Sequence, residues 1–158
     1  MTKTKSIEQM LAEDGLCVSG ITGESMLPML RRQTDRVLLL RATFPLQPDS
    51  VAVYKRGQDY ILHRVLRYEN GVYYLRGDNC IAEEAVPEEQ ILGVLSGFWR
   101  GETYHDCTGA ENAAWAARAR KTLPIRRLRA ALTTRIRRSI LRRCLQAERS
   151  PEEHDEAK

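Results

Sequence analysis

The chain has 158 residues, of which 42% are hydrophobic and 29% charged, and its formal net charge is +4. This length fits one domain with an appendage, and the first two thirds can support a hydrophobic core. The charge is uneven, because no acidic residue occurs from Asn112 to Ala147 while arginines are frequent there. Such a block predicts an anionic partner: a lipid surface, a nucleic acid or an acidic protein.

The cysteines and the apolar runs exclude several classes of protein. The four cysteines are scattered without a CxxC pair, which argues against a structural zinc site, and we expect no metal and no cofactor. The first fifteen residues lack the apolar region of a signal peptide. The longest apolar runs are far shorter than the ~20 residues of a transmembrane helix. We therefore expect a cytoplasmic or peripherally membrane-associated protein without a transmembrane segment.

Residues 1–15 are expected to hold a short helix over 6–15, because Ser6 and Gln9 form a capping-box pattern and Gly15 ends it. Short apolar or alternating runs separated by turn residues then predict strands. These strands are expected at 16–21, 35–42, 51–55, 59–68, 72–76 and 91–99, with one helical turn at 26–32. The pattern predicts a mainly β domain over 16–109, folded as a barrel or sandwich.

Residues 110–149 are expected to form a basic helical extension that Pro124 breaks into two pieces. In the second piece, apolar residues recur at steps of three and four along one helix face. These residues are Ile125, Leu128, Leu132, Ile136 and Ile140. The face either packs on the β domain or lies on an anionic membrane, with residues 125–145 in contact. Nucleic acid is an unlikely partner, because Trp115 is the only aromatic residue of the basic tract. Residues 150–158 are polar and expected to be disordered.

Three islands carry residues suited to nucleophilic catalysis: Ser25 in VSGITGESMLPML, His63 in DYILHRV and Asp78 in YYLRGDN. A serine hydroxyl attacks only when a base takes its proton and N–H groups receive the oxyanion. A histidine is suited to be that base, and a carboxylate can orient it. Each island alone also fits a simpler interpretation, as an ordinary turn or a structural histidine.

In combination and order, the three islands resemble the S24/S26 serine peptidase superfamily, which contains signal peptidases and self-cleaving repressors. The resemblance covers about residues 16–97 and follows the branch of endoplasmic-reticulum and archaeal type, in which histidine replaces lysine as the base. It implies a dyad of Ser25 and His63, supported by Asp78. That branch often carries a further aspartate, for which Glu83 or Glu84 would have to substitute here.

The resemblance also implies a substrate. It would be an extended peptide that adds a strand to the sheet and carries small side chains near the cleaved bond. Met26 is expected to line the pocket for one of these side chains. Gly23 stands where bacterial-type relatives carry a hydroxyl that stabilises the oxyanion, so backbone N–H groups, above all that of Ser25, would take this function.

The sequence therefore predicts a serine endopeptidase that cleaves a leader or signal peptide through an acyl-enzyme. A self-cleaving repressor is not expected, because about fifteen residues before the β domain cannot hold a helix-turn-helix domain. The alternative is a non-catalytic peptide- or membrane-binding module on the same fold, with the basic extension as its binding element.

Overall fold

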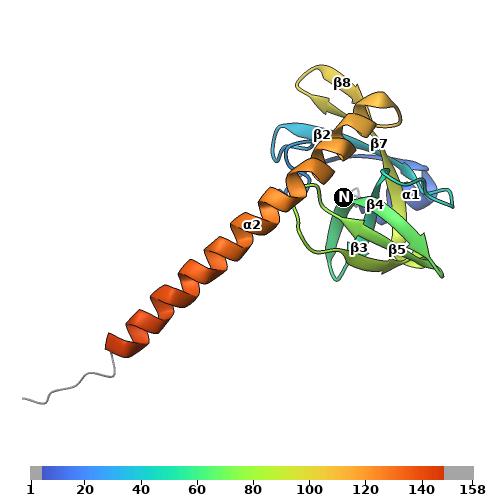
Figure 1. Ribbon diagram of the computed structural model, residues 1–158. Helices are drawn as coiled ribbons and strands as arrows, with labels where there is room; N and C mark the ends of the chain where they lie inside the picture. Colours follow the sequence, from blue (N-terminus) through green and yellow to red (C-terminus); the bar gives the residue numbers. More distant parts are fainter. Residues whose placement is uncertain (1–4, 148–158) are drawn as a thin grey trace, which may run out of the picture. The chain divides into compact units, whose positions relative to one another are not determined.

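The computed structural model describes residues 5–147, with side chains up to Arg142, and divides the chain into two compact units at Leu123/Pro124 (Figure 1). The elements follow one another in this order: α1 (Ile7–Glu13), β1 (Leu16–Gly20), β2 (Asp35–Arg41), β3 (Val51–Arg56), β4 (Asp59–Glu69), β5 (Val72–Arg76), β6 (Glu84–Pro87), a 3-10 turn (Glu88–Gln90), β7 (Ile91–Arg100), β8 (Thr103–Asp106) and α2 (Ala110–Ala147). The first unit contains all the strands.

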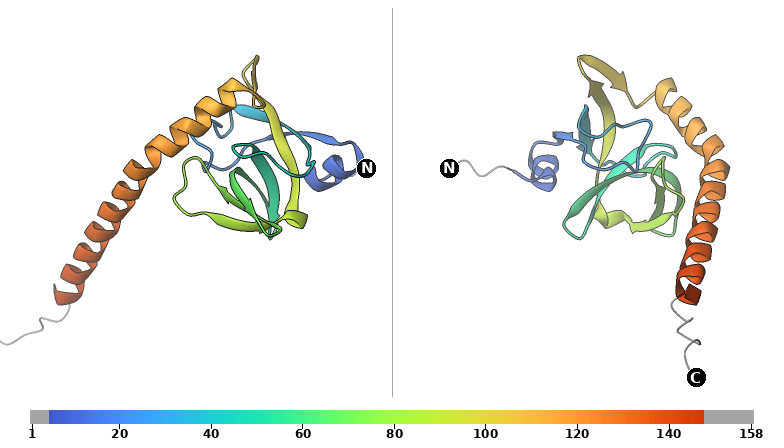
Figure 2. Two further views of the ribbon diagram at one scale, coloured as in Figure 1. Left: turned by 45° about the vertical axis from the view of Figure 1, so that its right-hand side comes forward. Right: turned by 90° about the vertical axis from the view of Figure 1, so that its left-hand side faces the viewer.

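The strands form one antiparallel sheet of eight strands (Figures 1 and 2). Their order is β1-β2-β7-β3-β4-β5-β6, and β8 pairs with β7. Within the described residues the end strands β1 and β6 do not pair with each other, so the sheet is not closed. The mainly β expectation is confirmed, and of the predicted barrel or sandwich the structure shows a sheet that is not closed into a barrel. The sequence analysis also missed β6 and β8, which have only four residues each.

Local signals explain several boundaries. Ser6 caps α1, and both hydrogen bonds of the capping box with Gln9 are formed. The turn between β3 and β4 places Gly57 at a φ of 63°, which glycine adopts without strain. Asn70 and Gly71 both have positive φ between β4 and β5, as a two-residue hairpin turn requires.

Strand β3 is buried on both faces and separates two hydrophobic clusters. Val51 and Val53 belong to the first cluster, which also contains Met26 and Met29. The alternate residues Ala52 and Tyr54 belong to the second cluster. Successive side chains of β3 therefore point into different parts of the core, as the period of a strand demands.

Helix α2 continues through Pro124, so the predicted break at that residue is wrong. A proline removes one backbone N–H, and the alanine- and arginine-rich flanks are strong helix formers that sustain the helix on both sides. The part before Pro124 belongs to the first unit, where Ala116 and Asn112 are buried. Among the described helices, none is long and apolar enough to cross a membrane. The predicted disordered tail, 150–158, lies outside the described residues.

A buried ion pair joins β4 to the loop after β5. Arg64 Nε lies 2.7 Å from Asp78 Oδ1, and Arg64 Nη2 lies 2.6 Å from Asp78 Oδ2. Both side chains are almost completely buried. The fork of the guanidinium matches the two carboxylate oxygens, which is the strong geometry for such a pair.

The remaining donors of Arg64 reach three other segments. Nη1 donates to the Asp49 carbonyl and to Asn112 Oδ1, both at 2.7 Å, and Nη2 lies 3.0 Å from Met29 Sδ. Arg64 thus connects β4 to the loop before β3, to the start of α2 and to the segment that follows Ser25.

We expect Arg64→Met to lower the free energy of unfolding by about 3–5 kcal/mol, because it leaves the Asp78 carboxylate buried without its partner. Urea unfolding followed by far-UV circular dichroism measures the loss. Arg67→Met is the matched control on the same strand, since the ion pairs of Arg67 are exposed and contribute little. Equal losses in the two variants would show that the buried pair does not stabilise the fold.

Candidate functional site

Ser25 lies in the loop between β1 and β2 and is half-buried. Its carbonyl accepts a hydrogen bond of 2.7 Å from the Asn79 N–H, and Asn79 Nδ2 donates to the Glu24 carbonyl at 3.3 Å. The Gly77-Asp78-Asn79 loop therefore holds the backbone of Ser25.

The segment after Ser25 is held as well. The Leu30 N–H donates to the Met26 carbonyl at 3.0 Å, which closes a single turn where the sequence predicted one. Arg100 Nη2 donates to the Met29 carbonyl at 2.8 Å, and the same guanidinium is paired with buried Asp35. Both ends of the Ser25 segment are thus fixed to the sheet, as a nucleophile requires.

His63 is buried on β4, opposite Ala52 of β3. The pairing of β4 with β5 begins at Arg64, so the loop that follows β5 passes beside His63. A Cβ atom at Gly77 would lie 2.6 Å from the Ser25 carbonyl oxygen, 3.0 Å from His63 Nε2 and 2.9 Å from Cys80 Sγ. Only glycine fits at this junction, where the backbone of Ser25 and the imidazole of His63 meet.

The Ser25 hydroxyl makes no direct hydrogen bond to the His63 ring in the described part of the chain; the two residues approach one another at Gly77 through the Ser25 carbonyl oxygen and His63 Nε2. Catalytic hydrogen bonds are often long in a protein without substrate and form when substrate binds. The Ser25 N–H also has no acceptor among residues 5–147, so it is available to an oxyanion.

The other side of the His63 ring belongs to a relay. Tyr54 Oη lies 3.0 Å from His63 Nδ1 and 2.6 Å from Glu84 Oε2. Burial raises the pKa of Glu84, but the hydrogen bond from Tyr54 and the charges of His63 and Arg56 bring it below its ordinary value. The ionised carboxylate can only accept, so the tyrosine hydroxyl donates to Glu84 and accepts from His63.

This relay determines the tautomer of His63. Because Nδ1 carries the proton that Tyr54 accepts, Nε2 holds the lone pair and points toward the junction with Ser25. Burial lowers the pKa of His63 below its ordinary value; Glu84 opposes this shift, Arg56 adds to it and Asp78 opposes it. The ring is therefore neutral at pH 7, with its basic nitrogen on the side of the serine.

The predicted acidic residues occupy different places. Both oxygens of Asp78 are bound by Arg64, and no hydrogen bond joins Asp78 to His63 in the described chain. Glu83 pairs with Arg67 and Arg76. Glu84 reaches His63 through Tyr54, and its Oε1 lies 3.8 Å from His63 Nδ1. Of the three carboxylates, Glu84 is thus the one that reaches His63, whereas Asp78 holds the loop that carries Gly77.

Lys55 is the lysine nearest to His63 in the sequence. Its Nζ lies 2.9 Å from Glu8 Oε2. This hydrogen bond raises the pKa of Lys55 above its ordinary value, and the lysine stays protonated at neutral pH. A protonated ammonium cannot accept the proton of a serine.

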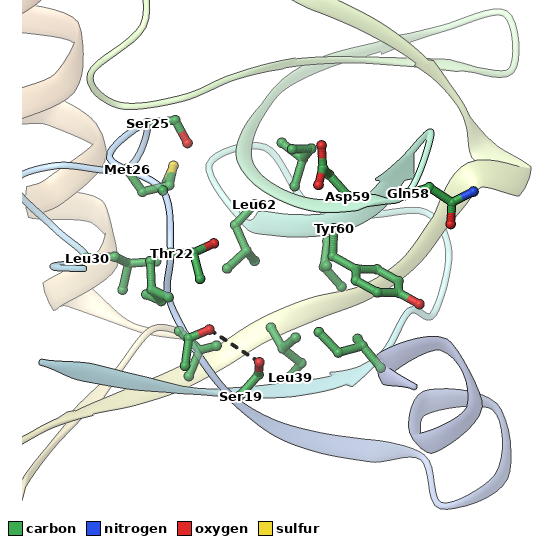
Figure 3. A pocket seen from close by; sticks show the side chains of 17 residues that line it. Ser19, Thr22, Ser25, Met26, Leu30, Leu39, Gln58, Asp59, Tyr60 and Leu62 are labelled. Atoms are coloured by element: carbon green, nitrogen blue, oxygen red, sulfur yellow. Dashed lines mark hydrogen bonds between the residues drawn. The ribbon is translucent and has the colours of Figure 1, made fainter. Parts of the chain in front are cut away.

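Ser25 lies at the rim of a cleft of about 360 Å³ (Figure 3). Gly23 and Met26 line it beside the serine, and Gln58, Asp59 and Tyr60 line the opposite side. The interior is mainly aliphatic, formed by Leu30, Val37, Leu39, Val53 and Leu62. Such a cleft accepts an apolar side chain next to the serine hydroxyl.

Two strand edges border this cleft. β1 is the terminal strand of the sheet, and the half of β4 from Asp59 to His63 pairs with β3 alone in the described residues. Residues of both segments line the cleft. Their backbone N–H and C=O groups can pair with an extended peptide.

The sequence analysis did not assign Tyr54, Arg64 and Gly77 to the site. The two-residue turn at 57–58 would have placed Tyr54 and His63 on the same face of the β3–β4 hairpin, because it pairs Arg56 with Asp59. No local signal indicates that the guanidinium of Arg64 binds Asp78, because the pair joins residues of different loops and strands.

Comparison with known proteins does not assign the chain to a family. No protein-family model matches the chain, and no curated protein matches it significantly. The functional interpretation therefore depends on the sequence motifs and the geometry of the site.

We expect the pKa of His63 to lie below the ordinary value of 6.5, since burial penalises the imidazolium. A 15N–1H NMR titration of uniformly labelled protein measures both this pKa and the tautomer. Above pH 7 the ring should carry its proton on Nδ1. Glu84→Gln should lower the pKa further, because it removes a charge that favours the imidazolium. A proton on Nε2 would contradict the relay.

Proposed function

We propose that the chain is a serine endopeptidase of the signal-peptidase-like kind, with Ser25 as nucleophile and His63 as general base. The observation that supports this most is the orientation of His63. Its Nδ1 is bound by Tyr54, and its Nε2 points to the junction where the backbone of Ser25 is held. The resemblance of the three islands to the S24/S26 superfamily supports the same assignment.

The reaction would proceed through an acyl-enzyme. His63 Nε2 takes the proton of Ser25 Oγ as Oγ attacks the carbonyl carbon of the substrate, and the Ser25 N–H stabilises the oxyanion. His63 then gives this proton to the leaving amine as the C–N bond breaks. Water hydrolyses the ester in the second half, again with His63 as base, and Ser25 is restored. Glu84 favours the transient imidazolium through Tyr54.

The substrate would be an extended peptide. The free edges of β1 and β4 support binding by strand addition, and the aliphatic cleft next to Ser25 and Met26 supports an apolar side chain near the cleaved bond. The superfamily resemblance narrows this to small side chains, as in a leader or signal peptide.

We expect Ser25→Ala and His63→Ala each to lower kcat for a small-residue leader peptide by about 10⁴-fold or more. The two residues act as one unit, so the double variant should lose no more than either single one. Cleavage is measured by mass spectrometry of the products, and unfolding curves check that each variant is folded.

Two controls make this result specific. Lys55→Ala should keep most of the activity, because Lys55 is paired with Glu8. Cys80→Ala should keep it as well, although the thiol lies near Gly77. If Ser25→Ala kept full activity and Cys80→Ala lost it, the nucleophile would be the Cys80 thiol and not the Ser25 hydroxyl. Binding of the peptide without any cleavage by the wild-type chain would instead support the non-catalytic module.

The relay predicts a distinct pH profile. Wild-type kcat/KM should fall as pH drops below about 6.5, as His63 becomes protonated, with its midpoint below that of an ordinary histidine. Glu84→Gln should move this midpoint to lower pH. Tyr54→Phe should lower kcat more than it changes KM. The loss in kcat should be smaller than the contribution of a general base, which is about 10²–10⁴-fold. Unchanged profiles in both variants would exclude the relay from the reaction.

A further inference from the structure

The second unit carries an apolar stripe on α2. Ile125, Leu128, Leu132, Ile136 and Ile140 recur at steps of three and four, which places them on one helix face. Each of these side chains is between 48% and 61% exposed. Every residue from Ala131 to Arg142 is exposed. Large aliphatic side chains gathered on one exposed face indicate a partner surface, whereas scattered ones do not.

The rest of the same segment is strongly cationic. Seven arginines lie between Pro124 and Arg142, and no acidic residue lies among them. These arginines are Arg126, Arg127, Arg129, Arg135, Arg137, Arg138 and Arg142. Their charge complements an anionic surface.

Among anionic surfaces, a lipid membrane can bind both the aliphatic stripe and the arginines of this segment. An interfacial helix buries its aliphatic face at the boundary of headgroups and acyl chains, while arginines bind the anionic headgroups. Arg129 lies within the arc of the stripe, where its long side chain can extend to the headgroups.

The other partners use only part of this pattern. Single-stranded nucleic acid is bound through basic groups and aromatic side chains that stack on bases, and residues 124–142 contain no aromatic residue. A second copy of the helix could cover the aliphatic stripe, but it would bring two arginine-rich segments together without any carboxylate to pair with them.

We propose that the Pro124–Arg142 segment of α2 binds anionic membranes, with the aliphatic stripe inserted shallowly and the arginines on the headgroups. This binding is independent of the peptidase chemistry, whose residues all lie before Pro124. It would place the chain on a membrane surface.

Co-sedimentation of the full-length chain with vesicles tests the proposal. Vesicles of phosphatidylcholine with 30% phosphatidylserine are compared with pure phosphatidylcholine vesicles, at about 50 and 300 mM salt. We expect at least tenfold tighter binding to the anionic vesicles at low salt, and weaker binding at high salt because of screening. No pelleting on anionic vesicles at low salt would overturn the proposal.

Matched variants separate the two features of the segment. Leu132→Asn with Ile136→Asn should weaken vesicle binding at least tenfold, because it interrupts the stripe. Leu141→Asn is the control, since Leu141 is 60% exposed but lies off the stripe. Arg127→Gln with Arg135→Gln and Arg138→Gln should weaken binding to anionic vesicles and reduce its salt dependence. Circular dichroism checks that each variant keeps its helix.

Three further outcomes would overturn the proposal. Equal binding of wild type and the Leu132→Asn, Ile136→Asn variant would show that the stripe does not enter the membrane. Tighter binding to a 20-nucleotide single-stranded RNA than to anionic vesicles at the same salt would assign the segment to nucleic acid. A dimer in analytical ultracentrifugation that the same double variant abolishes would assign the stripe to a second copy of the chain.

Discussion

The buried pair of Arg64 and Asp78 is the interaction on which the geometry of the site depends. Removing two charges from water costs desolvation free energy. Here the contacts of the Arg64 guanidinium with a carboxylate, a carbonyl, an amide and a thioether offset this cost. Each of these acceptors belongs to a different segment. The cost of separating any one of them from Arg64 keeps β4, the loop after β5, the turn after Ser25 and the start of α2 in register with one another.

This network has a direct consequence for His63, the residue that precedes Arg64 on β4. Adjacent residues of a strand point to opposite faces, so fixing the guanidinium in one part of the core directs the imidazole to the other. Asp78 lies between Gly77, where a Cβ atom would meet the imidazole, and Asn79, whose N–H donates to the Ser25 carbonyl. The positions of Ser25 and His63 relative to each other are therefore supported by residues outside the proposed Ser25–His63 dyad.

The sequence indicated more of the fold than of the site. Strong local signals, such as the capping box at Ser6 and the turn at Asn70-Gly71, correspond to observed boundaries. β6 could not be predicted, because its four residues become a strand only by pairing with β5. Glu84 is the first residue of β6, so its approach to Tyr54 depends on that same pairing. The helix propensity of the residues on either side of Pro124 outweighs the loss of one backbone hydrogen bond in α2. A rule that considers the proline alone therefore predicts a break where none occurs.

The length of the turn at Gly57-Gln58 limits how the β3–β4 hairpin can change during evolution. Its length of two residues sets the register that places His63 beside Tyr54. Adding one residue there would shift β4 by one position, unless a bulge absorbed it. Leu62 would then take the place of His63 opposite Ala52, and the imidazole would take the place of Arg64 opposite Val51. Surface turns usually tolerate insertions. In this hairpin, a change of length that alters no side chain of the site would abolish its arrangement, so insertions and deletions in the turn are excluded, whereas a substitution of Gln58 is permissible.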